Sequence, residues 1–238
     1  IAYRAIHERR ARPQQDVLSM LIAARDEDGK PMTDREVRDA CLAVFFAGHE
    51  TTACLLSWTW YVLATHEDVQ NLVRAEVLAA GADPATSPAS LVERLPYTQS
   101  VIQEVLRLYP PAYAFGRRAI RATTVGGHPV PQGTTVLMSP WAIQRDPRNF
   151  DDPESFLPER WRNGLASRLP RFAYFPFSSG PRRCIGSSFA TMEATIAIAT
   201  VVPRFRLSSP GTAEAAPSIT LRPAGGMPIT VTRREKQD

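Results

Sequence analysis

The chain has 238 residues, of which 44% are hydrophobic and 22% charged, and its formal net charge is +4 at pH 7. This length allows one good hydrophobic core, in one lobe or two, and the composition is ordinary for a soluble globular protein. The arginines are spread along the chain, which argues against nucleic acid, and no apolar run reaches the roughly 18 residues of a membrane span.

Helical patterns dominate the beginning of the chain. Residues 1–12 and 16–25 are compatible with short helices, and the second stretch has apolar side chains at a helical spacing. Thr33, followed by Glu36, forms a capping box that predicts a long helix to about residue 64. A glycine and several hydroxyls over 48–52 favour a bend or an opening in its middle. The apolar positions expected on its buried face are Val37, Cys41, Val44 and Phe45.

Three more helical patterns follow, separated by a loop. We expect a helix from residue 66 to a stop at Gly81, a loop over 81–90 and a short helical turn at 89–94. The stretch 97–109 predicts a helix that two prolines end.

The second half of the chain mixes strand and loop patterns. Short strands are expected around Val125, Val130 and Val136, followed by a long irregular segment over 145–172. The last elements expected are a helix over 187–202, strands over 218–222 and 228–232, and a frayed end from Arg233. These elements together predict a mainly α protein with small β-sheets, in the α+β class.

The stretch from Phe177 to Gly186 organises the rest of the chain. It places Cys184 in a turn-rich loop that leads into the N-terminus of the helix expected over 187–202. Helix N-termini favour a thiolate over a thiol, and a soft thiolate in an apolar setting suits iron or zinc.

The ligand set narrows the kind of metal site. The chain has three cysteines and four histidines, without the C-x-x-C or H-x-x-x-H spacing of zinc and iron–sulfur sites. A single thiolate is sufficient where a macrocycle supplies the other ligands of an iron. The alternative for Cys184 is a buried structural cysteine. We expect Cys41 and Cys54 to be small apolar residues of the core.

The cysteine stretch matches the pattern F-x-x-G-x-R-x-C-x-G at every fixed position. It resembles the cysteine-loop signature of the haem-thiolate monooxygenases, the cytochromes P-450. The resemblance implies that Cys184 is the axial ligand of the iron of haem b and that Phe177 shields its sulfur. It further implies a turn at Gly180, a close approach of the macrocycle at Gly186, and a propionate contact from Arg182.

The stretch Ala47-Gly48-His49-Glu50-Thr51-Thr52 lies in the middle of the long helix. A carboxylate beside a hydroxyl can relay protons into an apolar pocket, although a helix that merely tolerates these residues is an equal alternative. The stretch also resembles the family's A/G-G-x-D/E-T-T/S signature. That resemblance implies that Thr51 handles dioxygen, Glu50 feeds protons, Gly48 lets the haem approach, and Ala47 lines the pocket.

Glu104 and Arg107 lie three residues apart on an expected helix, so their side chains can pair. Such a pair is commonplace by itself. Together with Pro158-Glu159-Arg160 it resembles the family's E-x-x-R and P-E-R motifs. The resemblance implies that Glu104, Arg107 and Arg160 interlock through arginine forks and pin the irregular segment, in a structural rather than a catalytic role.

Two further positions resemble the family in part. Gly116-Arg117-Arg118-Ala119 is similar to its G-R-x-A, which implies that Arg117 contacts a haem propionate. A solvated side chain is the alternative for both Arg117 and Arg182. Gln144 stands where the family's H-R-D-P has histidine, which leaves a haem or water contact at this position open.

The resemblance covers nearly the whole chain and implies that residues 1–238 are the C-terminal haem-binding portion of a single cytochrome P-450 domain, without its N-terminal part. It implies insertion of one oxygen atom from O2 into a substrate, with electrons from a ferredoxin-, flavodoxin- or reductase-type donor. For this chain by itself we expect weak haem retention and little turnover. Two alternatives stay open. One is a truncated non-catalytic haem-binding or interaction module. The other is a haem-thiolate isomerase or dehydratase, and the pair Glu50 and Thr51 argues against this second alternative.

Substrate, partner and compartment are expected from side-chain character. The positions expected to line the pocket are small or apolar and favour a hydrophobic small molecule: Ala43, Ala47, Pro111–Phe115 and Val136–Met138. A basic face for an acidic donor, or a plain solvated surface, would come from Arg160, Arg162, Arg171 and Arg183. Scarce cysteines without a pairing pattern indicate a reducing compartment, so we expect a cytoplasmic protein; an anchor before Ile1 stays open.

Overall fold

The computed structural model describes residues 1–81 and 87–235. The chain divides into two compact units, Ile1–Glu50 and Thr51–Asp238, and the long helix α3 (Asp34–Thr65) contributes residues to both. Part of the loop expected over 81–90 and the last three residues of the expected frayed end lie outside the described residues.

Two short helices form the start of the N-terminal unit, α1 (Ala2–Ala11) and α2 (Val17–Ala23). Asp16 caps α2, because its Oδ1 accepts a hydrogen bond from the Ser19 N–H at 2.8 Å. The guanidinium of Arg9 donates to the other oxygen of Asp16 at 2.6 Å. That bond, with the capping bond, lowers the pKa of Asp16 to about 2. Both helices were predicted from the sequence.

Helix α3 begins with the predicted capping box. The Thr33 N–H donates to Glu36 Oε2 at 2.8 Å, and Thr33 Oγ1 accepts from the Glu36 N–H at 3.3 Å. The helix stays α-helical across residues 48–52, so the opening that the sequence favoured there does not form.

The apolar face predicted for the first half of α3 is only partly buried. Val37 is buried and Cys41 half-buried, whereas Val44 and Phe45 are 41% and 62% exposed. The burial expected for Val44 and Phe45 is therefore wrong in this structure. Periodicity reveals an apolar face but not what covers it, and α1 and α2 are too short to cover the whole of α3.

By length and composition alone, α3 is apolar enough to cross a membrane. The search for an uninterrupted apolar run led to the opposite expectation, because a hydropathy average tolerates polar residues that interrupt such a run. Core helices of soluble proteins pass the same test, so the finding is weak evidence for a membrane span.

The second unit contains the remaining helices of the described chain. They are α4 (Glu67–Ala79), α5 (Pro88–Arg94), α6 (Pro96–Leu108), α7 (Pro140–Ile143), α8 (Leu165–Arg168) and α9 (Ser187–Val201), with the 3-10 turns η1 (Pro158–Gly164) and η2 (Gly180–Arg182). Proline opens α5, α6 and α7, where its missing N–H costs no helical hydrogen bond. The sequence predicted α4, α5, α6 and α9, but not the single-turn helices α7 and α8, the second of which lies in the segment expected to be irregular.

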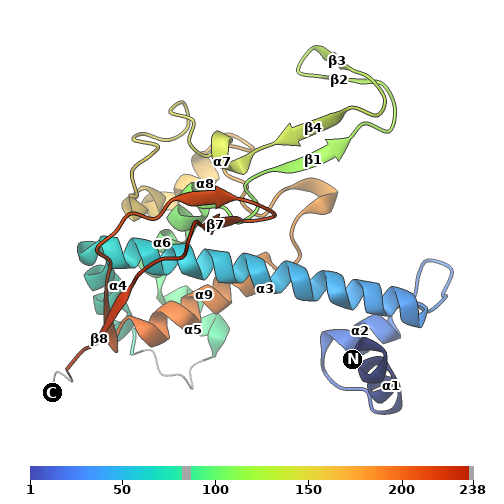
Figure 1. Ribbon diagram of the computed structural model, residues 1–238, viewed down its shortest axis with the longest axis horizontal. Coiled ribbons are helices and arrows are strands. Elements are labelled where there is room, and N and C mark those ends of the chain that lie inside the picture. The colour runs from blue at the N-terminus through green and yellow to red at the C-terminus, as the bar shows by residue number, and fades with distance from the viewer. Residues whose placement is uncertain (82–86, 236–238) are drawn as a thin grey trace. The chain divides into compact units, whose positions relative to one another are not determined.

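Short antiparallel strand pairs complete this unit. The strands are β1 (Phe115–Arg118), β2 (Thr123–Val125), β3 (His128–Val130), β4 (Thr135–Met138), β5 (Phe205–Ser208), β6 (Ala215–Pro217), β7 (Leu221–Pro223) and β8 (Thr230–Arg233). In the described residues β1 pairs with β4, β2 with β3, β5 with β8, and β6 with β7. Figure 1 shows the β2–β3 hairpin at the far end of the β1–β4 pair. The predicted class, mainly α with small sheets, is confirmed.

Several strand predictions need correction. β1, β5 and β6 were not predicted, because strands of three or four residues carry too few positions to show an alternating pattern. Within 218–222 only the last two residues are in a strand, and the Ser218 N–H instead closes a turn on Thr220 O at 3.1 Å. The fraying expected from Arg233 is wrong for the first two residues, because Arg233 lies in β8 and the Arg234 N–H donates to Arg204 O at 2.8 Å.

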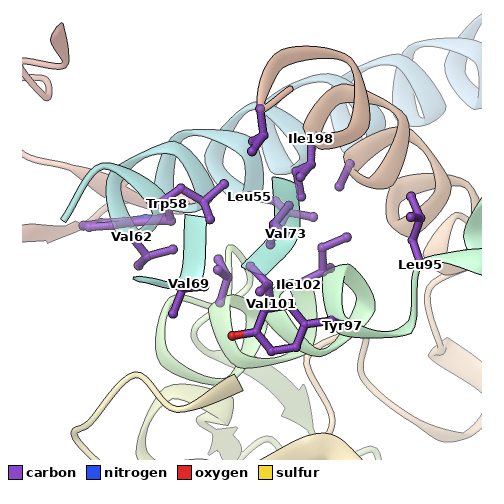
Figure 2. Close-up of a cluster of buried hydrophobic side chains, with 14 of the residues drawn as sticks. Leu55, Trp58, Val62, Val69, Val73, Leu95, Tyr97, Val101, Ile102 and Ile198 are labelled. Atoms are coloured by element: carbon purple, nitrogen blue, oxygen red, sulfur yellow. The ribbon is translucent and has the colours of Figure 1, made fainter. Parts of the chain in front are cut away.

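The hydrophobic core of the second unit lies between α3, α4, α6 and α9 (Figure 2). Its members include Leu55, Trp58, Val62, Val69, Val73, Val101, Ile102 and Ile198. Trp58 stacks on Tyr109 with ring centroids 4.1 Å apart, and its Nε1 donates to Leu221 O at 2.9 Å. Helix α6 contacts η1 as well as the core, so it lies next to the segment that precedes the cysteine loop.

Candidate haem site and its supporting network

The cysteine loop is a tight turn held by backbone hydrogen bonds. Ser178 and Gly180 have left-handed φ values of 59° and 70°. A Cβ on Gly180 would meet nothing within 4 Å, so backbone conformation rather than space favours glycine there. The Cys184 N–H donates to Phe177 O at 2.9 Å, and the Arg183 N–H donates to Gly180 O at 3.0 Å. These bonds fix the backbone that carries the thiol.

The thiol side of the loop faces outward among apolar side chains. Cys184 is exposed, and Ile185 and Phe189 are 94% and 64% exposed. Gly186 is the N-cap residue of α9, and a Cβ there would lie 3.9 Å from Cys184 Sγ, so glycine keeps space beside the sulfur. The ring of Phe177 packs against the hydrophobic core. The shielding of the sulfur by Phe177 stays a prediction.

The two arginines expected at the propionates are both exposed. Arg117 lies on β1, opposite Val136 of β4, where its Nη1 donates to Gly116 O at 2.9 Å and its guanidinium lies over the ring of Phe115. Arg182 ends the 3-10 turn of the cysteine loop. Neither guanidinium is buried, so both can reorient toward an anionic group.

The residues of the expected oxygen site all lie on α3, on both sides of the boundary between the two units. Ala47, Gly48 and Glu50 belong to the first unit and Thr51 to the second. A Cβ on Gly48 would meet nothing within 4 Å, so the backbone there is open to a close approach. The roles of these four residues stay predictions.

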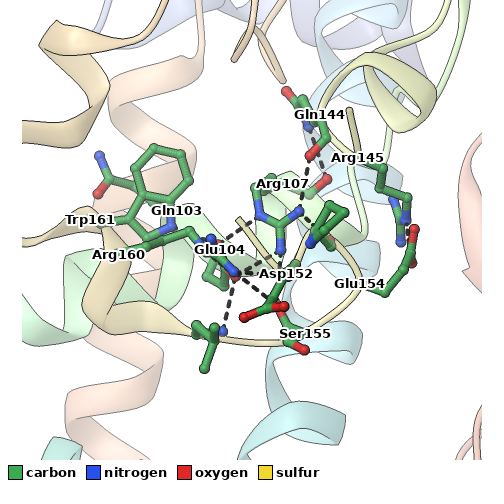
Figure 3. A network of polar contacts seen from close by, with 12 residues as sticks. Gln103, Glu104, Arg107, Gln144, Arg145, Asp152, Glu154, Ser155, Arg160 and Trp161 are labelled. Carbon is green, nitrogen blue, oxygen red and sulfur yellow. Dashed lines mark hydrogen bonds and ion pairs between the residues drawn. The ribbon is translucent and has the colours of Figure 1, made fainter. Parts of the chain in front are cut away.

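Glu104 and Arg107 form a fully buried pair on α6, with both side chains 0% exposed (Figure 3). Arg107 Nε and Nη2 donate to the two carboxylate oxygens of Glu104 at 2.9 and 2.8 Å. Arg160 Nε donates to the same carboxylate at 3.0 Å. The Leu157 N–H and the Trp161 indole N–H donate to it as well, at 3.0 and 2.8 Å. Five donors therefore surround one buried carboxylate.

The arginines of this network also hold main-chain carbonyls. Arg107 donates to the carbonyls of Gln144, Pro153 and Ser155 at 3.0, 2.6 and 3.0 Å. Arg160 donates to the carbonyls of Asp151 and Asp152 at 2.6 and 3.1 Å. Loop carbonyls that lack a strand or helix partner are satisfied in this way. The network therefore fixes the irregular segment after α7 against α6.

Three partners of this network were not identified from the sequence. Trp161 follows the P-E-R motif directly, and a buried indole needs an acceptor, which was the available signal. Tyr174 packs against Trp161, with ring centroids 4.5 Å apart, and donates to Gln103 O at 3.2 Å. Burial raises the pKa of Tyr174, and the Glu104 carboxylate adds to the rise. The third partner is Gln144, which the motif comparison marked as a departure and the structure buries fully.

One of the four arginines expected on the basic face, Arg160, is not exposed there. The side chain of Arg160 is 10% exposed and paired with Glu104, so it is not available to a partner. Arg162, Arg171 and Arg183 remain exposed. Arg171 and Arg183 line one open pocket of about 290 Å³ beside the cysteine loop.

Comparison with known proteins identifies the family. The profile of the family described as Cytochrome P450 matches residues 2–229. Cyclooctatin synthase and cyclooctat-9-en-7-ol 5-monooxygenase, both from Streptomyces melanosporofaciens, are 41% and 39% identical over 201 residues. Each alignment covers 83% of this chain and 43% of the relative.

The fold agrees with this result. The solved structure of retinoic acid-bound cyanobacterial CYP120A1 matches with a TM-score of 0.91 and 32% identity. The match covers 98% of this chain and 54% of that chain. The chain thus spans about half the length of the proteins it matches.

The residues present fit the cofactor of this family, haem b bound through a cysteine thiolate. One exposed thiol lies beside exposed apolar side chains, which suit the faces of an apolar macrocycle. No group of three or more His, Cys, Asp or Glu side chains able to hold a metal ion occurs among the described residues. The exposed thiol of Cys184 can supply the one protein ligand that a macrocycle-bound iron needs.

Proposed function

The chain belongs to the cytochrome P450 family, and we propose that it serves the insertion of one oxygen atom from O2 into a hydrophobic small molecule. The overall reaction consumes the substrate, O2, two electrons and two protons, and it gives the hydroxylated product and water. The exposed Cys184 thiol, in a loop closed by its own backbone, is the observation that carries this proposal.

Cys184 is the residue that would hold the haem iron through its thiolate, and the chain prepares it in two ways. The bond from the Cys184 N–H to Phe177 O fixes the backbone, and Gly186 keeps the space beside the sulfur open. Arg117 and Arg182 are the proposed donors to the propionates, because both are exposed cations with long side chains. When bound, the haem supplies the oxygen-activating chemistry.

Glu50 and Thr51 are the proposed proton-handling residues. The Thr51 hydroxyl would hold a proton for the reaction, and the Glu50 carboxylate would exchange protons with solvent. Ala47 and Gly48 precede them on the same helix, and a Cβ on Gly48 would meet nothing within 4 Å. Glu104, Arg107 and Arg160 take no part in the chemistry, because their donors and acceptors are used within the network.

We further propose the substrate class, the electron donor and the compartment. A hydrophobic substrate is supported by the names of matched proteins, which mention cyclooctat-9-en-7-ol and retinoic acid. An acidic ferredoxin-, flavodoxin- or reductase-type donor would meet the exposed Arg162, Arg171 and Arg183. Three free cysteines support a reducing compartment, the cytoplasm. The described chain would be the haem-binding portion of one cytochrome P450 domain.

The test is a haem titration of the purified chain, read by electronic absorption and by electron paramagnetic resonance of the ferric form. We expect a thiolate-type signature that Cys184→Ser removes and that Cys41→Ser, the matched control, retains. Weak binding is expected, so the haem stays in excess during the measurement. A wild-type chain without the thiolate signature, or a Cys184→Ser variant that keeps it, would overturn the assignment.

The catalytic half of the proposal needs a second measurement. With electron donor, isotopically labelled O2 and cyclooctat-9-en-7-ol or retinoic acid as probes, one labelled oxygen atom should appear in the product. A thiolate signature without labelled product from any hydrophobic probe would point instead to a non-catalytic haem-binding module.

A further inference from the structure

Gln144 is a fully buried amide that follows helix α7 and contacts two distant segments. Its Nε2 donates to Leu106 O and Arg107 O at 3.0 and 3.1 Å, which are carbonyls at the C-terminal end of α6. Its Oε1 accepts from the Phe175 N–H at 3.0 Å. The amide thus uses both donor hydrogens and one of the two lone pairs of its oxygen within the chain.

The main chain of Gln144 belongs to the buried network as well. Its carbonyl accepts from Arg107 Nη1 at 3.0 Å, as Figure 3 shows. Gln144 therefore accepts a bond from Arg107 at its backbone carbonyl and a bond from the Phe175 N–H at its side chain.

Phe175 leads directly into the cysteine loop. Its carbonyl accepts from the Ser178 N–H at 3.0 Å, and Phe177 O, one turn further, accepts from the Cys184 N–H at 2.9 Å. The ring of Phe175 meets that of Phe115 on β1 edge to face, with centroids 6.0 Å apart. The amide of Gln144 is thus connected to the backbone of Cys184 through one short turn.

We infer that Gln144 is a positioning residue for the thiol of Cys184. Its hydrogen bonds connect the buried network to the segment that begins the cysteine loop and so restrict the motion of that segment. This role requires a group with two donors and one acceptor at this site. A carboxylate of the same shape keeps the acceptor but loses both donors, and it places negative charge against two helix C-terminal carbonyls. The consequence for haem ligation, though not for the loop itself, depends on the function proposed above.

Gln70 provides a matched control within the same chain. It is also fully buried, its Nε2 donates to Leu63 O and Leu207 O at 2.6 and 2.9 Å, and its Oε1 accepts from the Leu207 N–H at 3.0 Å. Its contacts connect α3 with β5 and do not include the cysteine loop. Gln70 Oε1 also accepts from Arg234 Nη2 at 3.1 Å. The variants Gln144→Glu and Gln70→Glu each lose two donor hydrogens, at different places, and the new carboxylate at Gln70 keeps a guanidinium donor that the one at Gln144 lacks.

The first experiment measures amide hydrogen exchange and global unfolding of the apo chain for both variants. In Gln144→Glu we expect the Phe175 and Cys184 amides to exchange at least about tenfold faster than the loss of global stability explains, since 1.4 kcal/mol corresponds to a factor of 10. In Gln70→Glu the excess should appear at Leu207 instead. If Phe175 and Cys184 only follow global unfolding in Gln144→Glu, the inference is wrong.

The second experiment measures how much of the titrated haem is bound by the Cys184 thiolate. Gln144→Glu should lower the fraction of thiolate-type ferric signature at least twofold, and Gln70→Glu should leave it unchanged. Equal signatures in the two variants would overturn the positioning role. A wild-type chain without any thiolate signature would instead refute the proposed function, while the exchange experiment would still test Gln144. If Gln144→Glu does not fold, Gln144→Asn, a neutral amide too short to bridge both sides, takes its place in both experiments.

Discussion

The network around Glu104 and the loop around Cys184 belong to the same unit, and they differ in which of their groups are bonded within the chain. In the network the carboxylate and guanidinium are 0% exposed, and they are bonded to each other and to groups between residues 144 and 161. In the loop only the backbone is satisfied internally, whereas the thiol and its apolar neighbours are exposed.

This difference separates stability from chemistry. Buried charges must be paired within the chain, because an unpaired buried charge costs several kcal/mol. A ligand-binding thiol must be left available, so the chain holds its backbone and leaves its side chain free of packing. Substitutions in the network should therefore change stability, and substitutions at the thiol should change ligation.

The largest effect on stability is expected for Arg107→Ala. It leaves the Glu104 carboxylate buried without its main partner and should cost about 3–5 kcal/mol in the free energy of unfolding, measured with urea. Arg148→Ala, which removes the exposed ion pair with Asp146, is the control and should change stability far less. Similar costs for the two variants would contradict the separation.

Gly180→Ala should have the next largest effect. A side chain at a φ of 70° costs about 1–2 kcal/mol, and thermal unfolding of the chain would detect it. Gly211→Ala serves as the control, because its added Cβ also meets nothing within 4 Å and its φ lies outside the left-handed region. That control should be neutral or slightly stabilising. Equal behaviour of the two alanines would show that the turn tolerates any residue.

Tyr174→Phe tests the edge of the network through pH. Because the pKa of Tyr174 is raised in the folded chain, its contribution to stability is complete below the unfolded value of about 10 and is lost as pH rises beyond it. The variant should be about 1 kcal/mol less stable at pH 7, through loss of the bond to Gln103 O, and should lose less stability between pH 10 and 12.

The control for this experiment is internal. Burial also raises the pKa of Tyr97 and of Tyr109, and both titrate in the variant as in the wild type. The difference between the two urea-unfolding profiles therefore reports Tyr174. Parallel profiles above pH 10 would mean that the Tyr174 hydroxyl is not held neutral by the fold.

The smallest effect on stability is expected at the thiol itself. Cys184→Ala should change the free energy of unfolding by less than about 0.5 kcal/mol, because the side chain is exposed, and should remove the thiolate signature. Cys54→Ala should do the reverse, costing about 1 kcal/mol for a buried side chain and keeping the signature. A large loss of stability in Cys184→Ala would mean that the thiol side chain contributes to the packing of the fold.

Much of the local structure follows from the sequence. The capping box at Thr33, the proline that opens α6 and the glycine at the left-handed Gly180 all act within a few residues, so the pattern of neighbours determines them. The spacing of Glu104 and Arg107 likewise places them on one helical face. The cysteine stretch identified the family because its spacing is long and complete.

Tertiary structure decided how these local features are connected. Nothing near Gln144 in the chain indicates that its amide bonds to Phe175, or that Glu104 accepts from the Trp161 indole, since these partners lie 31 and 57 residues away. Burial of Val44 and Phe45 was predicted wrongly for the same reason, because an apolar face does not specify what covers it. The sequence by itself determined the longer helices, the cap at Thr33 and the identity of the thiol loop. The fold alone decided which groups are buried and paired, because hydrogen-bond satisfaction depends on segments that meet only in three dimensions.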